Sequence, residues 1–328
     1  MYYVVTGAAG FIGSRLVEAL NRAGVTDIVA VENLSRSDKV ANLARLEIAD
    51  FIDKNEFLER LESFDGAVEA VLHQGACSDT MEADGRYMMA NNYRYSKTLL
   101  DWCQDAEVPL IYASSASVYG AGPEFREERA CERPLNVYGY SKFLFDQLVR
   151  RALPGKSSQI AGFRYFNVYG PNEAHKGRMA SVAFHAHRQL LASGKVQLFE
   201  GSAGYGNGEQ RRDFVHVDDV VEVNLWFLEH RGVSGIFNCG TGRAQTFNQL
   251  AAAAINAVQG TELTARELAS RGLIEYVPFP EGLKERYQSF TEADLGRLRG
   301  AGYPGEFRGV EQGVASYVNE LMGKDRRA

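Results

Sequence analysis

The sequence predicts an α/β protein with a doubly wound parallel sheet and a second, smaller α/β lobe. Short apolar runs alternate with helical patterns through the first half of the chain. A glycine-rich stretch, TGAAGFIG, joins the first apolar run to the first helical pattern. The 328 residues exceed one typical domain. This alternation is typical of parallel strands joined by crossover helices.

The elements follow in order along the chain. Strands are expected at 2–5, 27–31, 70–73 and 109–113, and helices at 11–23, 87–104 and 138–152. The second half is less regular. It contains GFRYFNVYG (162–170), RRDFVHVDDV (211–220) and FNCGTG (237–242), with helical patterns near 181–192, 220–230, 246–258 and 291–299. We expect pieces of this half to form the smaller lobe, with a ligand held between the lobes.

Composition excludes several classes of protein. The 36 basic and 42 acidic residues give a net charge of −6 without a basic block, so neither nucleic acid nor an anionic membrane is an expected partner. No apolar run is long enough to span a bilayer, and the strand-like run YYVV begins at Tyr2 without a basic signal-peptide segment. The four cysteines show no metal-binding spacing. Reduced thiols in a cytoplasmic protein are expected.

The glycine-rich stretch has the spacing of a phosphate-binding loop. Gly7 permits the tight turn, Gly10 lets a phosphate approach the backbone, and Gly13 lets helix and strand pack closely. The helix N-terminus would add free N–H groups and partial positive charge. An ordinary glycine turn is the alternative. The position between the first strand and the first helix favours a Rossmann dinucleotide site.

The residues after the second strand leave the choice of dinucleotide open. Glu32 lies about twenty residues past the loop, where an acid usually binds a ribose 2′-hydroxyl and favours NAD. Arg36, Lys39 and Lys54 follow and could hold the 2′-phosphate of NADP. Solvated surface charges are the alternative for all three.

Two Tyr-x-x-x-Lys pairs occur, at 93–97 and 138–142. A buried helical stripe is expected along Tyr95, Leu99 and Cys103. The first pair, Tyr93 and Lys97, lies roughly 200° around the helix from this stripe. We therefore interpret the first pair as coincidence.

The second pair has the surroundings of a catalytic site. The run LIYASSASVYG (110–120) is a strand that ends in a serine cluster, and the C-terminal ends of parallel strands are where ligands bind. Ser115 would bond a substrate oxygen, and Tyr138 would act as acid or base. The Lys142 cation is expected to lower the pKa of the Tyr138 phenol, which is ordinarily near 10, and to hold a nicotinamide ribose. A tyrosine packed beside a partly buried lysine is the alternative.

The motifs TGAAGFIG, SSASVYG, YGYSK, FRYFNVYGP and DFVHVDDV together resemble the extended short-chain dehydrogenase/reductases of the NAD-dependent epimerase/dehydratase family. The segments HQGACS (73–78), FRYFNVYGPNEAHKG (163–177), MASVAFH (179–185) and IEYVPFPEGLKERYQ (274–288) are similar to the ADP-L-glycero-D-manno-heptose 6-epimerases, and this resemblance covers most of the chain.

The resemblance implies an isomerase that inverts C6″ of ADP-D-glycero-D-manno-heptose by transient oxidation and reduction with tightly bound NADP. This reaction belongs to the biosynthesis of lipopolysaccharide inner-core heptose. It requires an acid/base group on each face of the carbon, and the resemblance implies that these groups are Tyr138 and Lys176. A solvent-exposed loop charge is the alternative for Lys176. The resemblance also implies a cytoplasmic homo-oligomer, with a pentameric ring as one form.

The resemblance further implies a set of residues around the cofactor, with NADP favoured and NAD as the alternative. These residues are Gly7, Gly10, Phe11, Ile12, Gly13, Glu32, Asn33, Lys39, Lys54, Gln74, Gly75, Ala76, Cys77, Ser78, Asn91, Lys142, Val168 and Lys176. Residues 1–170 and 213–245 would form the NADP-binding Rossmann domain, and 171–212 and 246–328 the nucleotide-sugar-binding domain.

A second set would contact the sugar nucleotide. It consists of Ser115, Asn167, Arg178, His185, Phe199, Glu200, Gly201, Ser202, Arg212 and Tyr287. The chemistry of Arg212 suits a pyrophosphate clamp, and a packed core position is the alternative for His185. Three features depart from the pattern: Gln74 replaces an acid, Arg178 replaces a small residue, and the glycine-rich run 203–210 is longer.

Two rival functions remain at this point. A nucleotide-sugar 4-epimerase of the same fold would not require Lys176. A non-catalytic dinucleotide-sensing protein would typically lack the Tyr138–Lys142 pair. A 4,6-dehydratase is disfavoured because Ala116 and Ser117 stand where it needs an acid pair.

Overall fold

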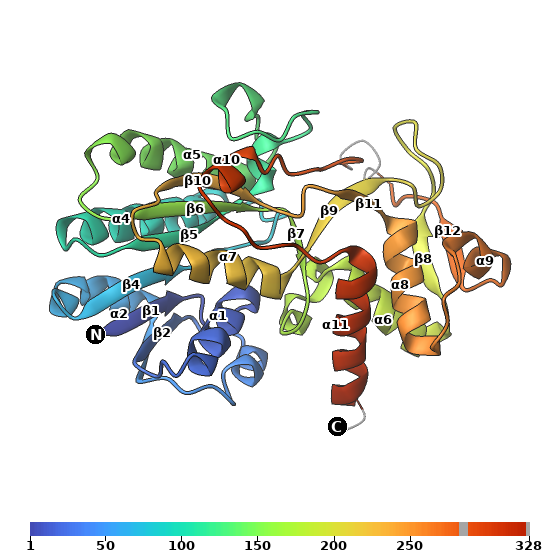
Figure 1. Ribbon diagram of the computed structural model, residues 1–328, viewed down its shortest axis with the longest axis horizontal. Helices are drawn as coiled ribbons and strands as arrows, with labels where there is room; N and C mark the ends of the chain where they lie inside the picture. Colours follow the sequence, from blue (N-terminus) through green and yellow to red (C-terminus); the bar gives the residue numbers. More distant parts are fainter. Residues whose placement is uncertain (282–287, 326–328) are drawn as a thin grey trace. The chain divides into compact units, whose positions relative to one another are not determined.

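The computed structural model describes residues 1–281 and 288–325, and it confirms the predicted fold class. Seven strands, all parallel, form one sheet in the order β10-β6-β5-β4-β1-β2-β3 (Figure 1). Their bounds are β1 Tyr2–Thr6, β2 Ile28–Glu32, β3 Asp50–Asp53, β4 Val68–His73, β5 Leu110–Ser115, β6 Ile160–Tyr165 and β10 Gly235–Cys239.

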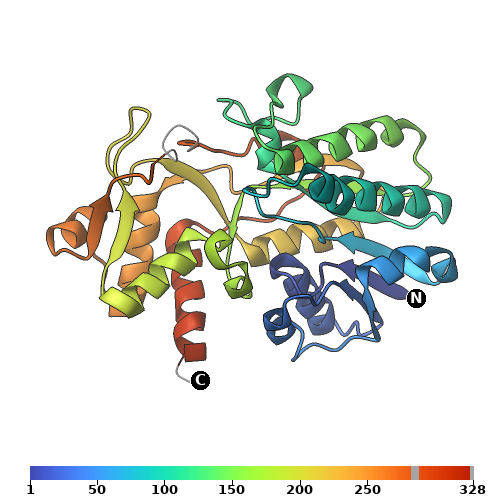
Figure 2. The ribbon, with the colours of Figure 1, turned by 180° about the vertical axis from the view of Figure 1, so that it is seen from behind.

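Helices cover both faces of this sheet. Figure 1 shows α1 (Phe11–Arg22) and α7 (Val217–Glu229) in front of the strands, and Figure 2 shows α4 (Tyr95–Asp105) and α5 (Val137–Ala152) in front of the other face. The short helices α2 (Lys54–Glu59), α3 (Gly85–Met88) and α10 (Gly296–Gly300) complete this part. Leu99, Phe145 and Val149 pack against strand residues such as Val71, so apolar burial fixes α4 and α5 on the sheet.

A second set of elements has its own core. Strands β7 (Asn167–Tyr169), β9 (Arg211–His216) and β11 (Ala244–Thr246) form one sheet, and β8 (Val196–Phe199) pairs in parallel with β12 (Ile274–Val277). The helices are α6 (Val182–Ser193), α8 (Phe247–Gln259), α9 (Ala265–Ser270) and α11 (Val310–Asp325). The alanine run at 251–254 lies in α8, which packs on both α6 and α11. Small side chains allow this close approach.

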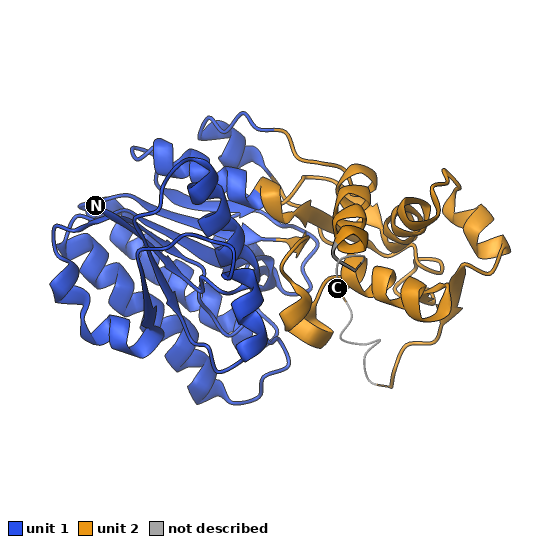
Figure 3. Ribbon diagram, turned by 90° about the horizontal axis from the view of Figure 1, so that it is seen from below, with its two compact units in different colours: residues 1–165, 220–239, 295–305 blue, residues 166–219, 240–294, 306–328 orange. Residues whose placement is uncertain are grey.

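The chain forms two compact units, coloured separately in Figure 3. Unit 1 consists of residues 1–165, 220–239 and 295–305, and unit 2 of 166–219, 240–294 and 306–328. The sequence predicts 1–170 and 213–245 for the first unit. In the structure 166–170, 213–219 and 240–245 belong to unit 2, and the segment 295–305 joins unit 1. No helix in the described part of the chain is long and apolar enough to span a membrane.

The helices predicted at 87–104 and 291–299 differ in the structure. The first is interrupted, because a π-helical turn at Met89–Arg94 lies between α3 and α4. The buried stripe of Tyr95, Leu99 and Cys103 is nevertheless confirmed, and Lys97 is exposed and paired with Asp101. The second prediction is wrong for most of its length, because Phe290 and Thr291 pair with Arg211 of β9 and only Gly296–Gly300 is helical.

Candidate active site

The glycine loop between β1 and α1 has no room for side chains. Gly7 has φ +67°, and a Cβ added there would lie 2.7 Å from the Gly75 nitrogen. A Cβ on Gly13 would lie 2.1 Å from the Gly7 carbonyl oxygen. Gly10 caps α1 without a side chain that could cover the first turn. These features fit the backbone approach and helix N-terminus that a dinucleotide pyrophosphate requires.

The end of β2 carries the residues predicted for the adenosine end. The Glu32 side chain is buried, and its Oε1 accepts hydrogen bonds from the Asn33 nitrogen at 2.7 Å and from the Lys39 Nζ at 3.4 Å. Lys54, at the start of α2, donates to the Asn91 side chain from the π-helical turn. The structure therefore brings Glu32, Asn33 and Lys39 together and pairs Lys54 with Asn91.

The segment after β4, predicted as a cofactor wall, is fixed by side chains from neighbouring elements. The Gly75 nitrogen donates to Thr6 Oγ1 at 3.1 Å. Asn92 is buried and bonds both the nitrogen and the carbonyl oxygen of Cys77, at 2.8 and 2.9 Å. Gln74 is half-buried, and its Oε1 accepts from the Tyr165 hydroxyl at 3.1 Å.

Sequence reasoning missed Asn92. Its Nδ2 also approaches Ser141 Oγ at 3.1 Å, so this residue ties the Cys77 segment to α5. The pattern that could have revealed Asn92 is a polar residue at helical spacing among the apolar residues Met88, Tyr95 and Leu99.

Tyr138 and Lys142 lie on the first two turns of α5. Asn136 caps this helix by accepting from the Gly139 nitrogen at 2.8 Å. Lys142 is buried, and its Nζ donates to the Ala113 carbonyl oxygen of β5 at 2.8 Å. Ser115, at the end of the same strand, lies close enough to the half-buried Tyr138 to act on the pKa of its phenol. The predicted Ser115, Tyr138 and Lys142 thus come together.

The proton affinities in this group differ from the expectation. Burial raises the pKa of Tyr138, and the neighbouring Ser115 hydroxyl opposes that rise only in part. Burial lowers the pKa of Lys142 to about 8, and the Asp146 carboxylate acts in the opposite direction. The predicted lowering of the Tyr138 pKa by Lys142 is therefore wrong for this structure. Tyr138 carries its proton at neutral pH.

Lys176 lies in unit 2, in the 3-10 segment Ala174–Met179 between β7 and α6. Its side chain is half-buried, and burial lowers its pKa while the neighbouring Glu173 raises it. Glu173 is itself fully buried and accepts from the Gly170 nitrogen at 3.2 Å and from the Ser181 nitrogen at 2.5 Å. One carboxylate therefore holds both ends of the loop that carries Lys176, a role that sequence reasoning also missed.

The remaining predicted substrate residues lie at several places in unit 2. Asn167 and Val168 begin β7, and the Asn167 side chain accepts from Thr291 Oγ1 at 3.3 Å. His185 is half-buried on α6, with its ring 5.9 Å from that of Phe184, and Arg178 is exposed.

Another group surrounds the end of β8. Phe199 stacks on Phe279 with ring centroids 4.6 Å apart, and Ser202 is buried and accepts from Gln210 at 3.2 Å. Glu200 is exposed. The nitrogen of Gly201 donates to the Asn207 side chain at 2.9 Å, which ties the longer loop back onto the strand end.

Arg212, on β9, is buried, with its guanidinium carbon 5.8 Å from the centre of the Phe247 ring. Tyr287 lies outside the described residues. Within 1–281 and 288–325, no group of three or more His, Cys, Asp or Glu residues is placed to hold a metal ion.

Comparison with known proteins identifies the family. Residues 3–240 match the model of the NAD dependent epimerase/dehydratase family. The chain is 62% identical to the ADP-L-glycero-D-manno-heptose-6-epimerase of Thiobacillus denitrificans over 327 residues, which cover 98% of each protein.

Solved structures agree with this assignment. The ADP-L-glycero-D-manno-heptose-6-epimerase of Helicobacter pylori matches with a TM-score of 0.79 and 27% identity, over 98% of this chain and 96% of that one. The UDP-glucose 4-epimerase of Thermotoga maritima matches with a TM-score of 0.78 and 28% identity, over 99% of each chain. These matches confirm the resemblance that the motifs indicate, and the chain belongs to the NAD dependent epimerase/dehydratase family.

Proposed function

We propose that the protein is an ADP-L-glycero-D-manno-heptose 6-epimerase that inverts C6″ of ADP-D-glycero-D-manno-heptose. The observation that carries the proposal is the 62% identity over nearly the whole chain to a heptose 6-epimerase. The fold alone does not choose the substrate, because a heptose 6-epimerase and a UDP-glucose 4-epimerase match with nearly equal TM-scores of 0.79 and 0.78. The pathway we propose is the biosynthesis of lipopolysaccharide inner-core heptose.

The proposed cofactor is NADP, which supplies a reversible acceptor for hydride when bound. The glycine loop would hold its pyrophosphate, and Lys39 and Lys54 would hold the 2′-phosphate. Lys39 supports this choice because its ammonium lies beside Glu32 and offsets the charge that would otherwise repel a phosphate. Gln74 to Ser78, Asn91 and Val168 would line the rest of the dinucleotide.

Epimerisation removes a hydride from C6″ and a proton from its hydroxyl, and returns both after the ketone presents its other face. Tyr138 and Lys176 are the proposed acid/base pair. Burial shifts their proton affinities in opposite directions. Tyr138 therefore starts in the protonated form that can give a proton to the ketone oxygen, and Lys176 is shifted toward the neutral form that can take one from the alcohol. Ser115 would bond the same oxygen.

The experiment that tests the proposal is incubation of the purified protein with ADP-D-glycero-D-manno-heptose, followed by chromatographic separation of the two epimers. We expect both epimers to appear from either starting compound. Conversion of UDP-glucose to UDP-galactose instead would favour a 4-epimerase. An ultraviolet spectrum that shows retained nicotinamide, without turnover of any nucleotide sugar, would favour a sensor. Light scattering in solution tests the proposed homo-oligomer.

A further inference from the structure

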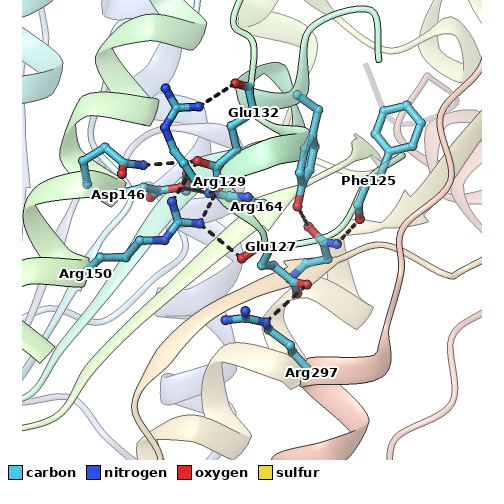
Figure 4. Close-up of polar contacts among 12 residues, drawn as sticks. Phe125, Glu127, Arg129, Glu132, Asp146, Arg150, Arg164 and Arg297 are labelled. Carbon is cyan, nitrogen blue, oxygen red and sulfur yellow. Dashed lines mark hydrogen bonds and ion pairs between the residues drawn. The ribbon is translucent and has the colours of Figure 1, made fainter. Parts of the chain in front are cut away.

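A network of charged side chains includes Asp146, which lies on α5 one turn after Lys142 (Figure 4). Asp146 and Arg164 are both fully buried and form an ion pair at 2.9 Å. Glu132, also buried, pairs with Arg164 at 2.5 Å and with Arg150. Two buried carboxylates and the buried Arg164 guanidinium, with the half-buried Arg150, therefore compensate one another's charge, which is the condition for stable burial of charge.

The Asp146 carboxylate connects α5 to the strand that carries the Lys142 acceptor. It accepts hydrogen bonds from the Tyr112 hydroxyl and Ser114 Oγ, both at 3.0 Å, and from Arg164 Nε at 2.9 Å. Tyr112 and Ser114 flank Ala113, whose carbonyl oxygen accepts from Lys142 Nζ. Lys142 and Asp146 are one turn apart on α5, and together they bond to three consecutive residues of β5, 112–114.

We propose that Asp146 is a positioning residue for Lys142. It fixes the register of α5 against β5 so that the ammonium reaches Ala113, and its negative charge keeps that buried ammonium protonated. The proposal rests on the proposed function, in which Lys142 acts as a cation beside Tyr138. Three donors, one of them a guanidinium, bond to the Asp146 carboxylate and fix its position.

The charges that face Lys142 support this assignment. On its own helix the facing acid is Asp146, which raises the Lys142 pKa. The loop after β4 contributes Cys77, whose thiol keeps its proton at neutral pH because burial raises its pKa. Strand β4 contributes His73, which burial keeps neutral by lowering its pKa to about 3. Asp146 therefore supplies the negative charge among the groups that shift Lys142.

The two buried carboxylates of the network offer a matched test. Asp146→Asn and Glu132→Gln each remove one charge that pairs with Arg164, but only Asp146 acts on Lys142. We expect the epimerisation rate of the wild-type protein to fall above about pH 8. This fall should begin at least about one pH unit lower in Asp146→Asn. In Glu132→Gln the rate should begin to fall at the same pH as in the wild-type protein, although we expect both variants to unfold more easily.

A measurement that needs neither substrate nor cofactor separates this inference from the proposed function. The ¹³Cε signal of Lys142, identified by its loss in Lys142→Met, is titrated by NMR in the three proteins. A lower midpoint in Asp146→Asn alone supports the proposal. An unchanged midpoint, or equal shifts in both variants, would overturn it.

A further outcome is that Lys142→Met is fully active while the midpoint is lowered in Asp146→Asn. That result would support the positioning role of Asp146 and remove Lys142 from the proposed function. Should Asp146→Asn fail to fold, Asp146→Asn/Arg164→Gln removes both charges of the pair and is titrated in the same way. The same downward shift is expected there, and a midpoint equal to that of the wild-type protein would contradict the proposal.

Discussion

Tyr138, Lys142 and Lys176 show one physical effect in two directions. Burial favours the neutral form of any titratable group, so it raises the pKa of the phenol and lowers the pKa of each ammonium. Desolvation alone thus keeps the phenol protonated and favours the neutral amine, the forms from which a proton donor and a proton acceptor start. The choice of lysine and tyrosine then decides which group gives the proton and which takes it.

The first prediction concerns Tyr138. Tyr138→Phe should reduce epimerisation by about a hundredfold or more, because a positioned general acid/base contributes on that scale. Bound dinucleotide, measured by absorbance, should remain. Tyr140→Phe is the matched control, since Tyr140 is exposed on the same helix and should keep full activity. Equal activity of the two variants would exclude the acid/base role.

The second prediction concerns Lys176. Lys176→Met should reduce epimerisation as strongly as Tyr138→Phe, because the second face of the carbon then lacks its acid/base. Lys195→Met serves as the control, since it removes a partly exposed lysine of the same unit that pairs with Glu275 at 2.8 Å. Full activity of Lys176→Met in the chromatographic assay would show that the two-base assignment is wrong.

The third prediction concerns cofactor choice. The double variant Lys39→Ala/Lys54→Ala should bind NADP more weakly and leave NAD binding unchanged, because the ammonium groups act on the 2′-phosphate. Calorimetric titration of the apoprotein with each dinucleotide measures both affinities. An equal loss for the two dinucleotides contradicts a contact with the 2′-phosphate.

At the scale of elements, the sequence predicts those helices and strands that follow from local periodicity. It does not predict those that depend on contacts with distant segments. The strand, glycine loop and helix at the start of the chain follow from short-range periodicity, and the structure confirms them. The helix expected at 291–299 failed because tertiary contacts override it: the Ala293 nitrogen donates to the buried Asp213 at 3.0 Å, and Thr291 bonds the backbone of Arg211. Such contacts between distant segments leave no periodic signal.

The same limit applies to the candidate site. Ser115, Tyr138 and Lys142 could be predicted because strand end and helix start are recognisable motifs. The supporting residues Asn92, Asp146 and Glu173 could not. Each gains its meaning only from partners on other elements, which single-sequence patterns do not reveal.

The fourth prediction belongs to the loop that joins β1 to α1. Gly13→Ala should abolish dinucleotide binding and destabilise the protein by about 1–3 kcal/mol, because the added methyl group meets the Gly7 and Ala8 backbone. Gly155→Ala is the control, since no atom lies within 4 Å of the added Cβ. Absorbance of bound cofactor and thermal unfolding measure the two effects. A Gly13→Ala protein that binds normally would contradict the assigned packing role.

At the scale of the whole molecule, each unit is assembled from separate stretches of the chain. The predicted cofactor residues lie mostly in unit 1, and the predicted substrate residues mostly in unit 2. Both tryptophans, Trp102 and Trp226, belong to unit 1. Tryptophan fluorescence therefore follows the unfolding of the unit that holds the glycine loop.

The last prediction uses this signal to test a buried histidine. His73 lies on β4 between Thr6 and Ser96, which bond its two ring nitrogens at 2.6 and 2.8 Å. Burial lowers its pKa to about 3. Because the unfolded chain has the higher pKa, near 6.5, it binds the proton first as the pH falls. The stabilisation is complete above about pH 6.5 and is lost progressively toward pH 3.

Between pH 7 and pH 5 this linkage should reduce the free energy of unfolding by about 2 kcal/mol in the wild-type protein. His73→Gln keeps a polar side chain between Thr6 and Ser96 but has no proton to gain, so its decrease over the same interval should be smaller by that amount. Urea unfolding followed by tryptophan fluorescence at the two pH values measures the difference. Equal decreases in the two proteins would mean that His73 is not the group that couples acidification to the opening of unit 1.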